Sequence, residues 1–317
     1  MNRLWRELAL LYAAKSAIVA MIPSRNSVAL TREANAAPVA SRSASLDLWD
    51  TTLVGQLPIN RVRMAEAVET ILRHARRVRT ERLVGEAAHV FGINAQIAVL
   101  ASEDEGFVQA ILSGHLLYPD GISLVIASHF LGRPLAERIP GSELMELLCC
   151  EAAKEGLSAY FLGGLPHAAE NCARILKDRY PGLGIAGHCC PPLGFELDRE
   201  ESAKVLRSIQ TAAPDLLFVG LGVPKQEFWI STNSPVLPIG VAFSVGAALD
   251  TISGYRQRAP LWTRRTGLEW LGRLVREPRR LWRRYLIANP KFVWLVLKQW
   301  IRQRRKPRRS AIGSPQA

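Results

Sequence analysis

Short apolar runs alternate, between residues 46 and 254, with longer stretches in which apolar residues recur every three or four positions. The runs have the length of strands buried on both sides, and the longer stretches have the period of helices. This alternation predicts an α/β domain in which helices cover both faces of a sheet. The predicted strands lie at residues 88–93, 157–162, 184–188, 215–220 and 237–243. The predicted helices run from Ser142 to Lys154, from Pro166 to about Tyr180 and from Arg199 to Ala212.

The chain before this domain lacks such a pattern. We interpret residues 1–45 as an N-terminal extension and linker, because residues 23–46 are rich in Ser, Ala and Asn without clear periodicity. The apolar run from Leu8 to Ile22 follows two arginines, as in a short signal sequence or an interfacial helix, but Lys15 interrupts it. No stretch reaches the ~18–20 uninterrupted apolar residues of a membrane span, so we do not expect an integral membrane protein.

After Gly254 the pattern changes to Trp and Arg at helical spacing. Residues 255–309 contain eighteen Lys and Arg against two acids, whereas the whole chain has a formal net charge of +13. A basic segment on a near-neutral body indicates a separate surface for phosphates, anionic lipid or RNA. We interpret 255–309 as a basic amphipathic appendage and 310–317 as a disordered tail. The prolines expected to divide the appendage into short helices are Pro260, Pro278 and Pro290.

The cysteines and histidines show no spacing typical of a metal site. Two adjacent pairs, Cys149-Cys150 and Cys189-Cys190, and the single Cys172 give neither a C-x-x-C motif nor an even disulfide framework. The sequence also lacks an H-E-x-x-H motif. We therefore expect buried, reduced thiols, no metal site and no bound cofactor.

Two glycine turns follow predicted strands. At the first, a strand runs into Gly163 and Gly164 and then into a helix with Pro166 near its first turn, where backbone amides could face a phosphate. The alternative is an ordinary strand-to-helix turn that needs Gly for its dihedral angles.

The second turn, from Gly220 to Glu227, has the same design with polar residues where the next helix begins. Lys225 stands where a dinucleotide fingerprint would have its third Gly, so a nicotinamide enzyme is a weak interpretation. Polar groups at the carboxyl end of a buried strand are nevertheless where open α/β sheets bind ligands. The candidate binding residues here are Gly222, Pro224, Lys225, Gln226 and Glu227.

Asp120 lies in the segment from Tyr118 to Gly121, which reads locally as a simple Pro-Asp-Gly turn. The functional alternative is a carboxylate held on a tight loop as a general base. No Asp-x-Asp motif occurs in the chain, so a leaving diphosphate would need arginines rather than a metal to neutralise its charge. The appendage supplies many arginines, although most of them suit a solvated or lipid-facing role equally well.

Taken together, several segments resemble the WecG/TagA/CpsF family of bacterial glycosyltransferases in consistent order from about Leu53 to Phe292. The matching stretches are Ile93–Ala95, Pro119–Gly121, Leu131–Ser142, Phe161–Gly164, Tyr180–Leu183, Gly220–Glu227, Arg258–Pro260, Gly267–Trp270 and Glu277–Arg279. Each motif alone is unspecific, whereas their common order is specific.

The resemblance implies a Rossmann-like core with a C-terminal appendage and metal-independent, inverting transfer from a UDP-sugar to an acceptor on polyprenyl diphosphate. By the same resemblance, Asp120 corresponds to the general base. The corresponding substrate-binding positions in the core are Asn94, Gly121, Arg138 and Gln226, and those in the appendage are Arg258, Arg273, Arg280 and Arg283. The implied donors are UDP-N-acetylmannosamine, its uronic acid form and UDP-glucose.

Gly92 departs from the family pattern, which usually has Thr two residues before the Asn. A hydroxyl contact to substrate is therefore missing or supplied by another residue. This departure concerns the choice of sugar more than the type of reaction.

The sequence thus favours a polysaccharide-building glycosyltransferase, peripheral on the cytoplasmic face of the bacterial inner membrane, that binds a UDP-sugar and a lipid-linked glycan but no nucleic acid. The oligomeric state stays open, a homo-oligomer included. The main alternative is a non-catalytic protein that docks on RNA or anionic membrane through residues 255–309; the polar cluster from Lys225 to Glu227 argues against it. The membrane role of the appendage rests on its basic residues and on Trp262, Trp270, Trp282, Trp294 and Trp300.

Overall fold

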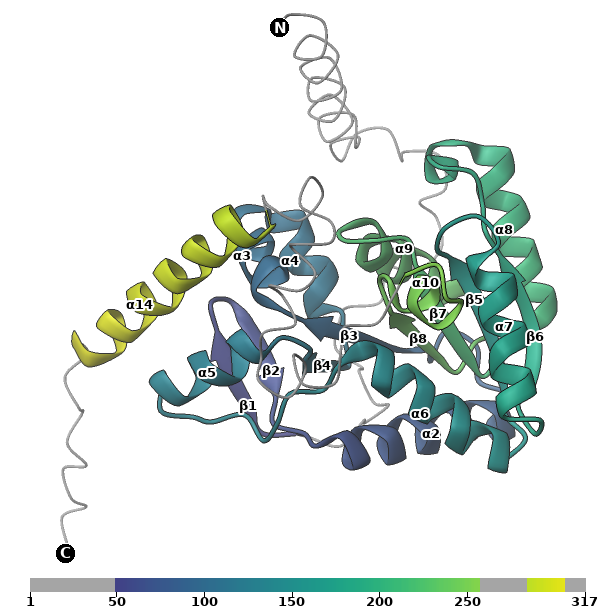
Figure 1. Cartoon of the computed structure of the whole chain (residues 1–317), viewed down its shortest axis with the longest axis horizontal. Helices are drawn as coiled ribbons and strands as arrows, with labels where there is room; N and C mark the ends of the chain where they lie inside the picture. Colours follow the sequence, from purple (N-terminus) through teal and green to yellow (C-terminus); the bar gives the residue numbers. More distant parts are fainter. Residues whose placement is uncertain (1–48, 257–283, 306–317) are drawn as a thin grey trace, which may run out of the picture. The chain divides into compact units, whose positions relative to one another are not determined.

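The structure is a computed structural model that describes residues 49–256 and 284–305 (Figure 1). The chain divides into two compact units, Met1–Ala44 and Ser45–Ala317, and all described residues lie in the second unit. The predictions for the N-terminal extension, for residues 257–283 and for the tail therefore lie outside the described residues.

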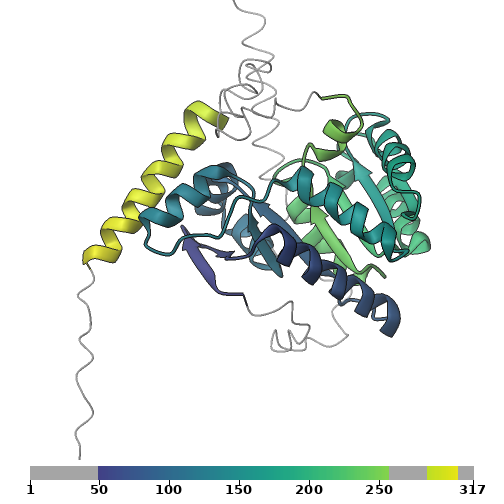
Figure 2. The ribbon, with the colours of Figure 1, turned by 60° about the horizontal axis from the view of Figure 1, so that its bottom comes forward.

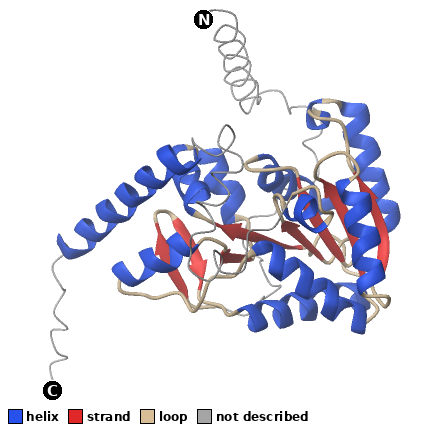
Figure 3. Ribbon diagram, viewed as in Figure 1, coloured by secondary structure: helices blue, strands red, loops and turns tan. Residues whose placement is uncertain are grey.

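Six parallel strands form the central sheet in the order β4-β3-β8-β7-β5-β6. The strands are β3 (Ala88–Ile93), β4 (Leu116–Pro119), β5 (Ser158–Gly163), β6 (Gly184–Cys189), β7 (Leu216–Gly220) and β8 (Val241–Ser244). Helices flank the sheet on both faces, so the predicted α/β architecture is confirmed, and the sheet is Rossmann-like (Figure 3).

Four of the five predicted strands agree with β3, β5, β6 and β7 to within one residue at each end. The fifth prediction, residues 237–243, is wrong at its beginning, because β8 starts only at Val241. Pro238 has no N–H to donate to a ladder, and the N–H of Ile239 bonds to the carbonyl of Leu237 instead of to a neighbouring strand. The three predicted helices correspond to α6 (Gly141–Lys154), α7 (Ala168–Arg179) and α8 (Arg199–Ala212).

Two hydrophobic cores lie on opposite faces of the sheet, because successive residues of a strand point to opposite sides. In β3, for example, Val90 belongs to the first core and Phe91 to the second. The first core is covered by α2 (Met64–Glu81), α6 (Gly141–Lys154), α7 (Ala168–Arg179) and α10 (Ala248–Ile252). The second is covered by α3 (Ala95–Glu103), α4 (Glu105–Leu112), α5 (Ile122–Phe130), α8 (Arg199–Ala212) and α9 (Lys225–Asn233).

A column of phenylalanine rings crosses three neighbouring strands in the first core. Phe161 on β5 stacks on Phe218 of β7 with ring centroids 5.6 Å apart, and Phe218 stacks on Phe243 of β8 at 5.0 Å. Each ring is buried, and burying such a side chain contributes about 1.5–3 kcal/mol to stability. The column holds together the strands whose carboxyl ends carry the glycine turns.

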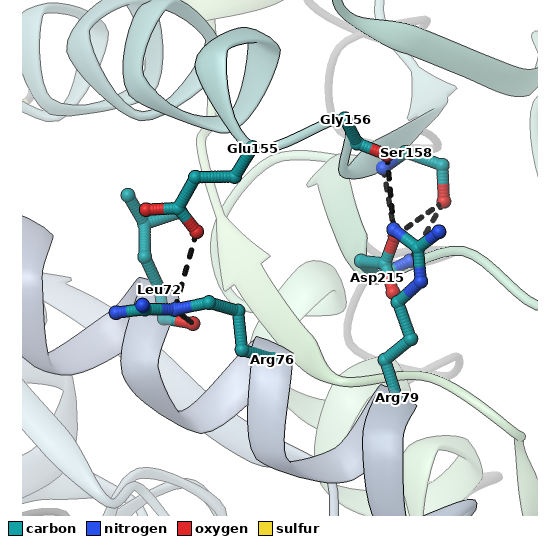
Figure 4. Close-up of polar contacts among 7 residues, drawn as sticks. All are labelled: Leu72, Arg76, Arg79, Glu155, Gly156, Ser158 and Asp215. Atoms are coloured by element: carbon teal, nitrogen blue, oxygen red, sulfur yellow. Dashed lines mark hydrogen bonds and ion pairs between the residues drawn. The ribbon is translucent and has the colours of Figure 1, made fainter.

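A polar cluster ties α2 to the opposite, amino-terminal ends of β5 and β7 (Figure 4). The carboxylate of Asp215 accepts hydrogen bonds from the Ser158 backbone N–H at 2.7 Å and from the Ser158 hydroxyl at 2.9 Å. Arg79 on α2 lies 3.4 Å from the same carboxylate, and Arg76 pairs with Glu155 at 3.1 Å. The polar groups of this cluster bond to one another, so the cluster stabilises the packing of α2 on the sheet.

The hairpin of β1 (Thr51–Val54) and β2 (Leu57–Asn60) links the sheet to the C-terminal helix α14 (Asn289–Arg305), and Figures 1 and 2 show helix and hairpin side by side. The Gln299 amide donates to the carbonyl of Leu53 at 2.7 Å and accepts from the Gly55 N–H at 2.8 Å. Phe292 is buried in the second core, and Lys291 pairs with Glu103 at 2.6 Å.

Helix α14 begins one residue before Pro290 and directly follows the π-helix η3 (Arg284–Ala288). The helical structure therefore changes type near Pro290 but, contrary to the prediction, is not divided there into separate helices. The other two prolines of the appendage, Pro260 and Pro278, lie outside the described residues. Within the described part of the chain, no helix combines the length and apolar character needed to cross a bilayer.

Candidate active site

A pocket opens at the carboxyl edge of the sheet, where β3 and β8 lie side by side. The chain leaves β3 for α3 on the second face and leaves β8 for α10 on the first face. Neighbouring strands whose connections diverge in this way leave a crevice between them, the usual ligand site of open α/β sheets. The cavity holds about 160 Å³, well above the ~10–15 Å³ that one water needs.

Asp120 directly follows β4 and lines this pocket. Its Oδ1 atom accepts a hydrogen bond from the Gly141 N–H at 2.9 Å, and its own N–H donates to the Ile93 carbonyl at 2.9 Å. The loop and the carboxylate are thus fixed from two sides. Because Oδ1 already accepts a hydrogen bond from the backbone, we assign to Oδ2 the task of taking a proton from a ligand.

Asn94 follows β3 and caps α3. Its Oδ1 atom accepts from the N–H groups of Gln96 and Ile97 at 3.0 and 3.2 Å. These two bonds commit the oxygen to the helix. The Nδ2 group is then the part of this pocket-lining side chain that can donate to a ligand.

Gly121 lets the loops after β3 and β4 approach each other closely. A Cβ atom at position 121 would lie 3.1 Å from the Cβ of Asn94. Gly121 also forms the N-cap of α5. It therefore holds Asn94 and Asp120 next to each other without lining the pocket itself.

Two charged residues join Asp120 in the pocket wall. The Arg138 Nε–H donates to the main-chain carbonyl of Asp120 at 2.9 Å, so a guanidinium group lies beside the candidate base. Glu143, in the first turn of α6, also lines the pocket and was not predicted from the sequence. Glu143 could have been inferred from the sequence, because it lies in the first turn of a helix that begins directly after Arg138 and Pro140.

Gln226 braces the loop after β8. Its Oε1 atom accepts from the Gly246 N–H at 3.0 Å, and its Nε2 group donates to Glu227 at 2.7 Å. The loop from Ser244 to Ala248 forms one wall of the pocket and was not predicted as part of the site. A signal was present in the sequence, because Gly246 follows a buried apolar strand by two residues, as Gly222 does after β7.

Glu227 lies behind the wall rather than in it. Its side chain is completely buried, and burial raises its pKa from the ordinary 4.5 to about 7. Its contact with Gln226 makes it a support for the residue that holds the Gly246 loop.

We expect Glu227→Gln to flatten the pH dependence of stability. A carboxyl whose pKa is higher in the folded than in the unfolded chain binds its proton more tightly when folded. The protonated Glu227 side chain therefore adds its full contribution to the free energy of unfolding below pH 4.5. This contribution, on the order of 3 kcal/mol, is lost as pH rises through about 7. Urea unfolding at several pH values measures it. If the free energy of unfolding changes with pH in the same way for the variant and the unmodified protein between these pH values, the raised pKa of Glu227 is contradicted.

The first glycine turn serves packing. A Cβ atom at Gly163 would lie 2.7 Å from the carbonyl oxygen of Gly220, so the close approach of β5 and β7 requires Gly there. The Gly164 N–H bonds to the Gly220 carbonyl, and the Leu165 N–H bonds to the buried carboxylate of Asp250. The N–H groups of Gly164 and Leu165, which were predicted as possible phosphate donors, are therefore bonded within the fold. Neither Gly163 nor Gly164 lines the pocket.

The second glycine turn lies at the edge of the pocket. Gly222 has a φ of +79°, a left-handed conformation that favours Gly, and its carbonyl accepts from the Gln226 N–H. Lys225 forms an ion pair with Glu196. Gly222, Pro224 and Lys225 do not line the pocket, whereas Val223 and Gln226 do.

The structure thus brings Asn94, Asp120, Arg138 and Gln226 together around one pocket. The predicted appendage arginines lie outside the described residues: Arg258, Arg273, Arg280 and Arg283. Among the residues described, no three His, Cys, Asp or Glu side chains are grouped as metal ligands would be. The five cysteines are free thiols. The prediction that they are buried is confirmed for Cys149 and Cys172 and wrong for Cys150, Cys189 and Cys190, which are only partly buried.

The family model for the glycosyl transferase WecG/TagA/CpsF family matches residues 52–306. A protein of Bacillus spizizenii is 35% identical over 214 residues, which cover 67% of this chain and 80% of the relative. Proteins of Staphylococcus aureus strain MW2 and Bacillus subtilis are 33% and 32% identical, covering 65% of this chain and 78% of each relative. All three are named N-acetylglucosaminyldiphosphoundecaprenol N-acetyl-beta-D-mannosaminyltransferase.

Proposed function

The chain belongs to the WecG/TagA/CpsF family of glycosyl transferases, and from this premise we propose that it transfers a hexosyl group from a UDP-sugar to a polyprenyl-diphosphate-linked acceptor. N-acetylmannosamine is the first donor sugar to test, because three relatives carry it in their names. The observation that carries the proposal is the fixed Asp120 carboxylate, beside Arg138, in the pocket at the carboxyl edge of the sheet.

In the proposed mechanism, Asp120 takes the proton from the acceptor hydroxyl as that oxygen attacks the anomeric carbon. The attack comes from the face opposite the UDP group, so the C–O bond to the diphosphate breaks and the configuration at the anomeric carbon inverts. Asn94 and the Gly246 loop are placed to orient the sugar, since both line the same pocket as Asp120.

Negative charge grows on the diphosphate as it leaves, and a cation must stabilise it. Arg138 lies in the pocket, and the family resemblance implies the same task for Arg273, Arg280 and Arg283. A preorganised donor at a developing charge contributes roughly 3 kcal/mol to catalysis in other enzymes. The chain has no Asp-x-Asp pair that would hold a divalent metal on the diphosphate, so we propose that arginines do this work without one.

A donor screen tests this function. The purified full-length chain is incubated with lipid-linked N-acetylglucosamine diphosphate and, in turn, with UDP-N-acetylmannosamine, UDP-glucose and UDP-N-acetylglucosamine, and UDP release is measured with and without EDTA. We expect acceptor-dependent release with one donor, unchanged by EDTA. Release with none of them overturns the proposed function, and loss with EDTA that magnesium or manganese restores overturns its metal independence.

The surface of α14 favours attachment to an anionic membrane. Its inner side packs on the core through Phe292, whereas Val293, Trp294 and Leu297 are 65%, 56% and 41% exposed. The ammonium group of Lys298 lies 5.8 Å from the Trp294 ring, and three further basic residues occupy the last turn. Exposed apolar side chains beside cations are typical of a helix that lies in the headgroup region of a bilayer.

Helix α5 extends this surface towards the pocket. Ile126 and Phe130, one turn apart, are 53% and 68% exposed, and Leu53 on the neighbouring β1 is 51% exposed. Because α5 begins directly after Asp120 and Gly121, a membrane along α14, β1 and α5 would bring a lipid-linked acceptor close to the base. The proposed location is the cytoplasmic face of the inner membrane, where UDP-sugars are available.

Substitutions on α14 test the membrane role. Truncation after Gly254 would also remove Phe292 from the second core, so point variants give a clearer result. We expect Trp294→Ala with Arg302→Glu and Arg305→Glu to bind vesicles of phosphatidylglycerol and phosphatidylcholine at least ~10-fold more weakly, because each basic residue near such a surface contributes about 1 kcal/mol. Cosedimentation in moderate salt measures this.

The matched control carries the same change of charge on α8, at Arg199→Glu and Arg207→Glu, both exposed positions. It should bind the vesicles as the unmodified chain does. If the α14 variant binds the vesicles as strongly as the unmodified chain, or if the unmodified full-length chain does not bind them, α14 does not anchor the enzyme.

A further inference from the structure

Tyr118 is the residue of β4 that pairs with Gly92 of β3. Its side chain is 2% exposed and lines the pocket. A Cβ atom at Gly92 would lie 2.6 Å from the Tyr118 hydroxyl oxygen, and one at Gly141 would lie 2.9 Å from it. The hydroxyl therefore occupies a slot that exists only because two neighbouring positions lack side chains.

The slot lies beside the candidate base. The Cβ position of Gly141 that is 2.9 Å from the Tyr118 hydroxyl is also 3.8 Å from the Asp120 Oδ1 atom. The phenol and the carboxylate thus flank the same part of the pocket, where the reacting sugars would meet. The charges facing the phenol are those of Asp120 and Glu227, and burial together with both carboxylates raises the pKa of Tyr118 well above its usual value.

We propose that the Tyr118 hydroxyl contacts a polar ring substituent of a sugar in the pocket and thereby contributes to the choice of substrate. This inference rests on the proposed glycosyl transfer. A neutral phenol donates one hydrogen bond and can accept others, which suits a sugar hydroxyl or acylamino group. Its ring is held by β3 and α6, so the hydroxyl has a fixed position from which it can discriminate between epimers.

The same geometry answers the question raised by Gly92. A Thr side chain at that position would collide with the Tyr118 hydroxyl, so this chain cannot carry both groups as the backbone stands. In this interpretation, the hydroxyl that Gly92 cannot provide after β3 is supplied from the neighbouring strand.

Tyr118→Phe removes only the oxygen, and Tyr160→Phe is its matched control. Tyr160 is equally buried, but its hydroxyl bonds to Ser208 on α8, outside the pocket. The assay measures kcat and KM for UDP-N-acetylmannosamine, UDP-N-acetylglucosamine and UDP-glucose, and separately for the lipid-linked acceptor. Ratios of kcat/KM between donors do not depend on the folded fraction of a preparation, so partial misfolding does not obscure the result.

We expect Tyr118→Phe to change by about 10-fold either a ratio of kcat/KM between donors or kcat/KM for the acceptor, since this is the usual value of one hydrogen bond in discrimination between substrates. If the contact is with the donor sugar, the preference among the three donors falls. If it is with the acceptor sugar, the donor preference stays and kcat/KM for the acceptor falls. Tyr160→Phe should stay within about twofold of the unmodified chain.

Two results would overturn the inference. One is a Tyr118→Phe variant whose kcat/KM values all lie within twofold of the unmodified chain. The other is an equal fall in kcat for every substrate with unchanged KM and unchanged preference, which indicates that Tyr118 only positions Asp120. Failure of the unmodified chain to use any of the three donors would instead count against the proposed function.

Discussion

Replacing Asp120 with Asn will lower kcat by about 10²–10⁴, the usual contribution of a general base, and will leave the fold intact. Asn keeps the size of the side chain and an oxygen that can accept the Gly141 N–H, so the loop after β4 retains its anchor. What the variant loses is the ability to take the proton of the acceptor hydroxyl. Steady-state UDP release in the presence of acceptor measures the loss, and circular dichroism verifies the fold.

Glu143→Gln is the control, because Glu143 is the other carboxylate lining the pocket. It should reduce kcat far less than Asp120→Asn does. Near-normal turnover by a folded Asp120→Asn variant, or a larger loss with Glu143→Gln, would transfer the role of base from Asp120 to another group.

Replacing Arg138 with Ala will lower kcat/KM by about 10²–10³. The side chain donates to the main-chain carbonyl of Asp120 at 2.9 Å, and it places a guanidinium group in the pocket where the diphosphate would leave. Removing one preorganised donor at a developing charge costs other enzymes about 2.7–4 kcal/mol. We expect the loss mainly in kcat, because the charge to be stabilised develops in the transition state.

Arg133→Ala is the control for this prediction. Arg133 lies in the same loop, but it pairs with the exposed Asp50 at 2.6 Å and does not line the pocket. Its loss should leave kcat/KM nearly unchanged. If both arginine variants lose activity equally, the effect comes from disturbing the loop rather than from the charge of Arg138.

The sequence predicted those parts of the fold that carry a long, uniform signal. Strands β3, β5 and β7 are mostly apolar and almost completely buried, and such runs are readable without knowledge of their neighbours. The four-residue strand β4 and the hairpin of β1 and β2 were not predicted, because segments so short acquire their identity from pairing. At β4, the Pro-Asp-Gly sequence predicted a turn, and the short strand that ends in this sequence was therefore not recognised.

For the candidate site, local patterns contributed less than the order of motifs along the chain. The local pattern at Asp120 allowed both a simple turn residue and a general base, and only the family resemblance favoured the second role. Conversely, the Gly163-Gly164 turn has the local pattern of a phosphate loop, yet strand packing and Asp250 use those groups within the fold. The slot for Tyr118 could not be predicted, because it depends on Gly92 and Gly141, which lie 49 positions apart along the chain and meet only in the folded protein.

The lipid product of the reaction tests the central claim most directly. The full-length chain is incubated with N-acetylglucosaminyl-diphosphoundecaprenol and UDP-N-acetylmannosamine, and the lipid fraction is analysed by mass spectrometry and by NMR of the new linkage. We predict that the acceptor lipid gains one hexosyl group, with its anomeric configuration opposite to that in the donor, and that Asp120→Asn abolishes the product on the same timescale. UDP release without a glycosylated lipid, or a product that retains the donor configuration, would contradict the account.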